Sequence, residues 1–129
     1  MTVDNNVDLL EALSDYCCLE SIECDVASNG LQGLFKMQEK EYDLILLDIA
    51  MPEYSGVDIL HQLKKQGVRN KNIVVITATD LKIKDFDDYY EVGVKEVLSK
   101  PTELWMIDKV MTKYRGRLKK AYPLDIKKV

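Results

Sequence analysis

The chain has 129 residues, of which 47% are hydrophobic and 31% charged, and its formal net charge at pH 7 is -4. This composition is typical of one globular domain and excludes the disordered and collagenous classes. No apolar run approaches the roughly 20 residues of a transmembrane helix, and acidic residues follow Met1 where a signal peptide would be basic, so the cytoplasm is the expected compartment.

The cysteine and histidine content excludes several kinds of site. Cys17, Cys18 and Cys24 are odd in number and lack a second cluster, so neither a disulfide framework nor a zinc site is predicted, and we interpret them as small core residues. His61 is the only histidine, which excludes a multi-histidine metal site and favours an exposed helix residue.

Charge is unevenly distributed along the chain. Residues 1–48 hold 11 acidic and 2 basic side chains, whereas eight basic residues and one acid, Asp125, lie from Lys109 onward. We interpret this basic end as a solvated helix followed by a tail over residues 116–129. Contact with nucleic acid is less favoured, because no aromatic residues interleave the basic ones.

Hydrophobic periodicity predicts strands that alternate with helices. The elements of the first half are, in chain order, a helix over 7–19, a strand over Ile22–Val26, a helix on Leu31, Leu34, Phe35 and Gln38, a buried strand over Leu44–Asp48, and a helix on Val57, Leu60 and Leu63 that ends near Gly67. Those of the second half are a buried strand over Ile73–Thr77, a weaker helix over 83–92 on Ile83, Phe86 and Tyr90, a strand over Glu96–Ser99, and a helix opened by Pro101 on Leu104, Ile107, Met111 and Tyr114.

This alternation predicts an α/β fold with a parallel sheet and helices on both faces. A doubly wound five-stranded sheet in the order 2-1-3-4-5 would place the first strand in its interior. Only three residues precede Asp4, so either this strand is truncated or the natural chain begins earlier. A short central strand leaves backbone groups unpaired, and we expect reduced stability or compensation by a partner chain.

Polar side chains are predicted to meet at the carboxyl ends of the strands. Asp48, Thr77 and Lys100 each end a strand, and Asp4 and Asn5 follow the first one. Two carboxylates about 4 Å apart would repel by on the order of 4 kcal/mol at an effective dielectric near 20. Mg²⁺ would relieve this repulsion and prefers such oxygen ligands. The alternative is an ion pair between Lys100 and Asp48 without chemistry.

Four motifs in this order carry a resemblance to a known family: "VDNNVDLLEAL", "LLDIAMPEYSG", "VVITA" and "VLSKP". They resemble the receiver domain of two-component response regulators, over about residues 3–115. The resemblance implies a flavodoxin-like receiver fold in residues 1–115, phosphorylated on aspartate by a sensor histidine kinase or phosphotransfer protein. It also implies a downstream protein target, a homodimer through the last strand and helices, and a cis peptide between Lys100 and Pro101.

The resemblance assigns roles to individual residues. Asp48 is the phosphoacceptor, and Asp4, Asn5 and the backbone carbonyl of Ala50 complete the Mg²⁺ site with it. Lys100 balances charge on the phosphoryl oxygens, and Thr77 hydrogen-bonds one of them. Catalysis in such a site is positioning and electrostatics.

The chain departs from the family at three places. Asn5 stands where a second acid is usual, which predicts weaker metal binding. Val97 replaces the usual switch aromatic, so either Tyr89 or Tyr90 repacks instead or the switch is blunted. Ala50 and Thr79 line the path of water to the acyl phosphate and cannot orient it, which predicts a long-lived phosphorylated form.

The leading hypothesis is a phosphoacceptor signalling domain that switches a protein-binding surface and is not a turnover enzyme. It acts alone or belongs to a longer regulator or hybrid kinase. The alternative is a degenerate receiver that binds a partner independently of phosphorylation, which Asn5, Val97 and the short first strand favour. A Mg²⁺-dependent phosphatase is disfavoured, because Ala50 stands where its general acid would be.

Overall fold

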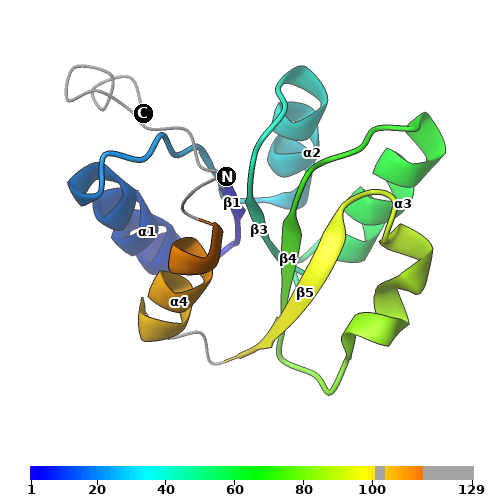
Figure 1. The fold of residues 1–129 in the computed structure, drawn as a ribbon. Coiled ribbons are helices and arrows are strands. Elements are labelled where there is room, and N and C mark those ends of the chain that lie inside the picture. Colours follow the sequence, from blue (N-terminus) through cyan, green and yellow to red (C-terminus); the bar gives the residue numbers. More distant parts are fainter. Residues whose placement is uncertain (101–103, 115–129) are drawn as a thin grey trace.

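A computed structural model describes residues 1–100 and 104–114 (Figure 1). The predicted basic tail and the predicted cis peptide before Pro101 lie outside these residues. The five strands form one parallel sheet in the order β2-β1-β3-β4-β5, as predicted. In chain order the elements are β1 (Thr2–Val3), α1 (Val7–Leu19), β2 (Val26–Ala27), α2 (Gly30–Glu39), β3 (Ile45–Asp48), α3 (Gly56–Gln66), β4 (Ile73–Thr77), the 3-10 helix η1 (Ile83–Tyr89), β5 (Val94–Ser99) and α4 (Leu104–Tyr114).

Strand β1 has two residues and lies in the interior of the sheet, between β2 and β3. Thr2 pairs with Val26 on one side and with Leu46 on the other. The backbone pairing continues past both ends of the strand, since the N–H of Asp4 donates to Ala27 O and the N–H of Leu46 donates to Met1 O. These bonds compensate for the short strand within the chain itself.

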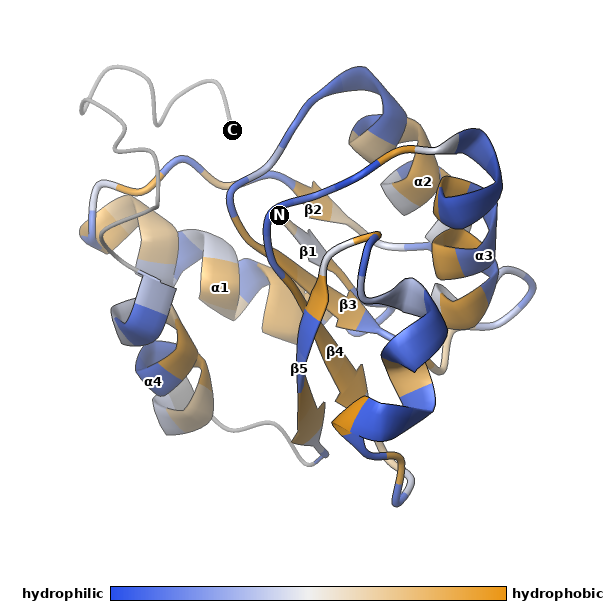
Figure 2. Ribbon diagram, turned by 45° about the vertical axis from the view of Figure 1, so that its right-hand side comes forward, coloured by the Kyte–Doolittle hydropathy of each residue, from blue (hydrophilic) through white to orange (hydrophobic). Residues whose placement is uncertain are grey.

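Helices cover both faces of the sheet and bury two separate core clusters. Helices α1 and α4 lie on one face, and α2, α3 and η1 lie on the other (Figure 1). Successive residues of a strand point to opposite faces. Ile45 and Leu47 therefore join the cluster under α2 and α3, whereas Leu46 joins the cluster under α1 and α4. Hydrophobic strands sit between helices that are polar on their outer sides (Figure 2).

Short polar residues set the beginnings of the helices at the carboxyl edge of the sheet. The side chain of Asn6 accepts from the N–H of Leu9 and begins α1, and Asn29 accepts from the N–H of Gln32 and begins α2. Ser55 and Asp58 form a capping box at the start of α3. Each cap fixes the residue at which the loop after a strand gives way to a helix.

Two predicted elements of the first half are wrong in detail. The strand predicted over Ile22–Val26 is shorter: Ile22 forms only an isolated β-bridge, its N–H bonds Cys17 O, and β2 begins at Val26. In α2, Leu31 and Phe35 are exposed. Leu34 is buried as predicted, together with Gly30, Gly33 and Met37.

Two elements of the second half also differ from prediction. The helix predicted over 83–92 is the shorter η1. Phe86 is buried within it, whereas Ile83 and Tyr90, the residue after its end, are exposed. A break in helical geometry at Phe86 accounts for the weak periodicity there. Strand β5 begins two residues earlier than predicted, at Val94, which is fully buried.

Candidate functional site

Asp4, Asp48, Thr77 and Lys100 meet at the carboxyl edge of the sheet. Asp4 follows β1, Asp48 and Thr77 end β3 and β4, and Lys100 follows β5. The Nζ of Lys100 lies 3.0 Å from Asp48 Oδ1. The N–H of Lys100 donates to the carbonyl of Thr77 at 2.7 Å, which continues the β4–β5 pairing and directs the lysine back over the central strands.

Asp48 is a fully buried carboxylate at the end of an apolar strand. Its Oδ1 accepts from Lys100 and from the N–H of Ala50 at 3.1 Å. Its Oδ2 has no hydrogen-bond partner among the described residues. A buried carboxylate oxygen without a partner is costly to fold, so this atom marks a place where a cation or a reacting group fits.

Asp4 is a second buried carboxyl group, within hydrogen-bonding reach of Asp48. Its Oδ1 accepts from the N–H of Asn6 at 2.8 Å, while its Oδ2 has no partner among the described residues. Burial raises the pKa of Asp4 above its ordinary value, the Asn6 N–H opposes this change, and the charge of Asp48 adds to it. The pair therefore resists carrying two negative charges unless positive charge is supplied.

The loop after β3 folds tightly against the site. The N–H of Gly56 donates to Ile49 O, and a side chain at Gly56 would place its Cβ 2.5 Å from the carbonyl oxygen of Asp48. Glycine is required by this close approach of two backbones. The loop thereby holds the backbone at Asp48 while Ala50, two residues on, stays exposed.

Thr77 is buried, and its hydroxyl is already engaged by a neighbour in the following loop. Its Oγ1 lies 2.9 Å from Thr79 Oγ1 and accepts from the N–H of Thr79 at 3.1 Å. The interaction with Thr79 was not expected from the sequence. Threonine hydroxyls often bond a backbone N–H two residues later, so the short spacing was the available signal.

The donor set at this edge suits a hard divalent cation. Two buried carboxylates that interact electrostatically each have one unpartnered oxygen, and the sequence neighbours Asn5 and Ala50 are exposed. Carboxylate, amide and backbone carbonyl oxygens are ligands that Mg²⁺ accepts. Within residues 1–100 and 104–114, no group of three or more His, Cys, Asp and Glu side chains is placed to hold a metal ion. At this edge the residue after Asp4 is the amide Asn5, which is not one of these residue types.

The residues around the missing switch aromatic differ in burial. Val97 and Tyr89 are partly buried against the core cluster under α2 and α3. Tyr90 is exposed, and Lys95 Nζ lies 3.7 Å above its ring. Tyr89 and Val97 therefore pack against the same core cluster, whereas Tyr90 does not.

Comparison with known proteins identifies the family. A family model described as "Response regulator receiver domain" matches residues 1–112. The chain is 35% identical over 103 residues to the transcriptional regulatory protein CpxR homolog of Haemophilus influenzae, covering 78% of this chain and 43% of that protein. It is 34% identical over 90 residues to the aerobic respiration control sensor protein ArcB of Escherichia coli K12, covering 70% of this chain and 12% of ArcB. The chain belongs to the receiver domains of response regulators.

Solved structures agree with this assignment of fold. The receiver domain of the Francisella response regulator 1452 superposes with a TM-score of 0.72 at 23% identity, covering 89% of this chain and 91% of that one. The response regulator TrrA of Thermotoga maritima, solved in complex with Mg²⁺-BeF, superposes with a TM-score of 0.65 at 26% identity, covering 88% and 95%. In residues 1–100 and 104–114, no helix is long and apolar enough to cross a membrane.

Proposed function

We propose that this receiver domain accepts a phosphoryl group on Asp48 from a phosphohistidine of a sensor histidine kinase or a phosphotransfer protein, and that this changes a protein-binding surface. The observation that supports the proposal is the unpartnered Oδ2 of the fully buried Asp48, whose Oδ1 is paired with Lys100 and whose charge acts on Asp4. The receiver unit proposed is residues 1–115.

The transfer is an in-line displacement at phosphorus. An oxygen of the Asp48 carboxylate forms the new bond, the bond between phosphorus and the imidazole nitrogen breaks, and the donor histidine leaves as the neutral ring after taking a proton. Lys100 would shift its contact from Asp48 to the phosphoryl oxygens as negative charge develops on them. Thr77 would exchange its contact with Thr79 for one of those oxygens, which couples phosphorylation to the β4 loop.

Asp4, Asp48, the carbonyl of Ala50 and the amide oxygen of Asn5 are the residues that would hold Mg²⁺. The bound ion would supply positive charge against the two carboxylates and the incoming phosphoryl group. Asn5 contributes an oxygen without negative charge, so this chain is expected to bind the ion less tightly than a site with a third carboxylate.

A second candidate is a degenerate receiver that binds its partner without phosphorylation. It is favoured by the contact of 3.0 Å between Lys100 and Asp48, which makes a closed ion pair in the absence of phosphate, and by Val97 in place of the switch aromatic. The two candidates differ in one measurable property, the covalent modification of Asp48.

The test is intact-mass measurement after incubation with acetyl phosphate and MgCl₂. The first candidate predicts the gain of one phosphoryl group in the wild type, and its loss in Asp48→Asn. Asp43→Asn is the matched control, because Asp43 precedes the same strand at the opposite edge of the sheet, where it pairs with Lys71. A wild type that gains no mass under conditions that leave it folded would support the degenerate receiver.

A further inference from the structure

A cavity of about 70 Å³ opens at the amino edge of the sheet, opposite the site around Asp48. It lies between the first residues of β1 and β3, the end of α1 and the segment before β2. Apolar side chains form its walls, among them Leu13, Leu46 and Met111 from both helices of this face and from β3. Two cysteines, Cys17 and Cys24, also line it.

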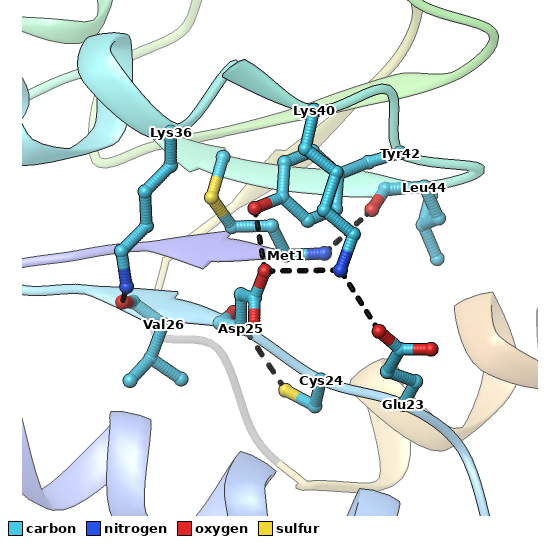
Figure 3. Close-up of polar contacts among 9 residues, drawn as sticks. All are labelled: Met1, Glu23, Cys24, Asp25, Val26, Lys36, Lys40, Tyr42 and Leu44. Carbon is cyan, nitrogen blue, oxygen red and sulfur yellow. Dashed lines mark hydrogen bonds and ion pairs between the residues drawn. The ribbon is translucent and has the colours of Figure 1, made fainter. Parts of the chain in front are cut away.

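Charged and phenolic groups surround this cavity (Figure 3). Asp25 Oδ2 accepts from the hydroxyl of Tyr42 at 2.6 Å and lies 3.4 Å from Lys40 Nζ, which also pairs with Glu23 at 2.8 Å. Cys24 Sγ lies beneath this network, with the carbonyl of Asp25 at 3.8 Å. The network holds the segment before β2 in place and keeps the cavity open beside the thiol.

Cys17 and Cys24 are brought together by the turn that follows α1. The N–H of Ile22 donates to the carbonyl of Cys17 at 2.8 Å, and Ser21 takes a left-handed conformation with φ of 56°. This turn reverses the chain so that both thiols line the same cavity and belong to the same core cluster. Both side chains are buried, whereas Cys18 is exposed.

The two thiols are electrostatically unequal. Interaction with the Cys17 thiol lowers the pKa of Cys24 to about 7 against the opposing effect of burial. The Met1 amino group and Lys36 lower the Cys24 pKa further, and Asp25 raises it. The same interaction and burial raise the pKa of Cys17. With a thiolate beside a thiol, the thiolate can attack an oxidant and the thiol can then form a disulfide with the oxidised cysteine.

We propose that Cys17 and Cys24 are a redox modification site that forms a reversible disulfide on reaction with a small hydroperoxide. The inference is independent of the proposed phosphoryl transfer, because it uses none of the residues at the carboxyl edge of the sheet. It assigns the cavity as the path by which the oxidant reaches two side chains that are otherwise buried.

The chemistry is a two-electron oxidation of two thiols. The Cys24 thiolate attacks one oxygen of hydrogen peroxide, the O–O bond breaks, and Cys24 sulfenic acid and hydroxide form. The sulfur of Cys17 then attacks the sulfur of Cys24, and the sulfenic oxygen leaves as water with the proton of Cys17. In total two thiols and one peroxide give one disulfide and two waters.

The size of the cavity determines the class of oxidant. A cavity of about 70 Å³ admits a few water-sized molecules, because about 10–15 Å³ of this kind of space is enough for one. Hydrogen peroxide fits this space, whereas a glutathione disulfide does not. Glutathione disulfide is therefore expected to react only with the exposed Cys18.

The experiment treats the folded, reduced chain with hydrogen peroxide and measures intact mass. We expect the loss of two hydrogens in the wild type and in Cys18→Ser, the return of this mass with dithiothreitol, and no such loss in Cys17→Ser or Cys24→Ser. Cleavage after Glu20 and Glu23 separates Cys24 from the peptide that carries Cys17 and Cys18. In Cys18→Ser the two fragments therefore stay joined only if the disulfide between Cys17 and Cys24 has formed. With glutathione disulfide we expect one adduct, absent in Cys18→Ser.

The Cys18→Ser measurement decides between these outcomes even if a buried cysteine variant fails to fold, because Cys18 is exposed. Joined fragments that separate on reduction support the proposal. Addition of oxygen to Cys18 alone, or free thiols at both Cys17 and Cys24 after the exposed Cys18 has been fully oxidised, would overturn it.

Discussion

Lys100 Nζ lies 3.0 Å from Asp48 Oδ1, so a partly exposed cation holds a fully buried carboxylate in place. The contact crosses β4, because Lys100 follows β5 and Asp48 ends β3. It therefore joins the outer strand to the middle of the sheet at the point where the chemistry is proposed. The first prediction concerns how much this pair contributes to stability.

Lys100→Met should lower the free energy of unfolding by about 1–3 kcal/mol, because it leaves Asp48 charged and buried beside Asp4. The lysine is partly exposed, which keeps the effect below that of a fully buried pair. Urea unfolding at pH 7 in the presence of EDTA measures it. Lys71→Met is the control, since its pair with Asp43 is at the surface and should change little. Equal effects of the two substitutions would contradict the prediction.

Asp4 should make stability fall as pH rises. Its pKa in the folded chain is raised above the ordinary 3.8 by burial, so its stabilising, protonated state is fully present below 3.8 and is lost as pH rises through the folded pKa. Asp4→Asn removes the pH-dependent loss of stability and keeps a side-chain oxygen that can accept from the N–H of Asn6. In urea unfolding without metal, the variant should gain stability relative to the wild type between pH 4 and 7. If the difference in the free energy of unfolding between the variant and the wild type does not depend on pH, the pKa of Asp4 is not raised in the folded chain.

Asn5→Asp should tighten Mg²⁺ binding by about tenfold, because it adds a third negative charge next to Asp4 and Asp48. Isothermal titration calorimetry with MgCl₂ measures the affinity. Asn6→Asp is a matched control, since it adds the same charge one residue later on a side chain that caps α1. The control should change the affinity by less than about threefold. Equal tightening in both variants would mean that Asn5 is not a ligand.

The phosphorylated form should decay slowly, on a scale of minutes or longer. Ala50 has no group to orient water, and the hydroxyl of Thr79 is engaged with Thr77 at 2.9 Å. Thr79→Glu should accelerate decay by at least about tenfold, because a carboxylate at this rim can act as a general base for the attacking water. Thr79→Ser should leave the decay unchanged. The measurement is the decrease of phosphorylated mass after removal of acetyl phosphate, and a wild-type half-life of seconds would contradict the prediction.

The sequence predicted the sheet order and the edge at which the polar side chains gather. Fully apolar strands such as Leu44–Asp48 specify burial on both faces, and parallel strands bring their carboxyl ends to one side. For this reason Asp48, Thr77 and Lys100 could be placed together without coordinates. Their roles in phosphoryl transfer remain predictions until Asp48 is tested.

Other features could not be read from local pattern. The periodicity of α2 suggested that Leu31 and Phe35 were buried, yet the helix packs closely on β1 through Gly33, whose Cα faces Val3. That orientation depends on the neighbouring strand, which the helix sequence does not contain. Likewise, nothing in the spacing of Cys17 and Cys24 indicated a shared cavity, because residues distant in the chain, such as Leu46 and Met111, complete its walls.

The sequence by itself determined most of the strand and helix segments and the set of residues at the carboxyl edge, since burial pattern is a local property, while the order of the strands followed from the family resemblance. Only the tertiary structure decided which carboxylate oxygens lack partners, which neighbour holds the Thr77 hydroxyl, and that two thiols face one cavity. These are contacts between segments distant in the chain, and their distances follow from packing.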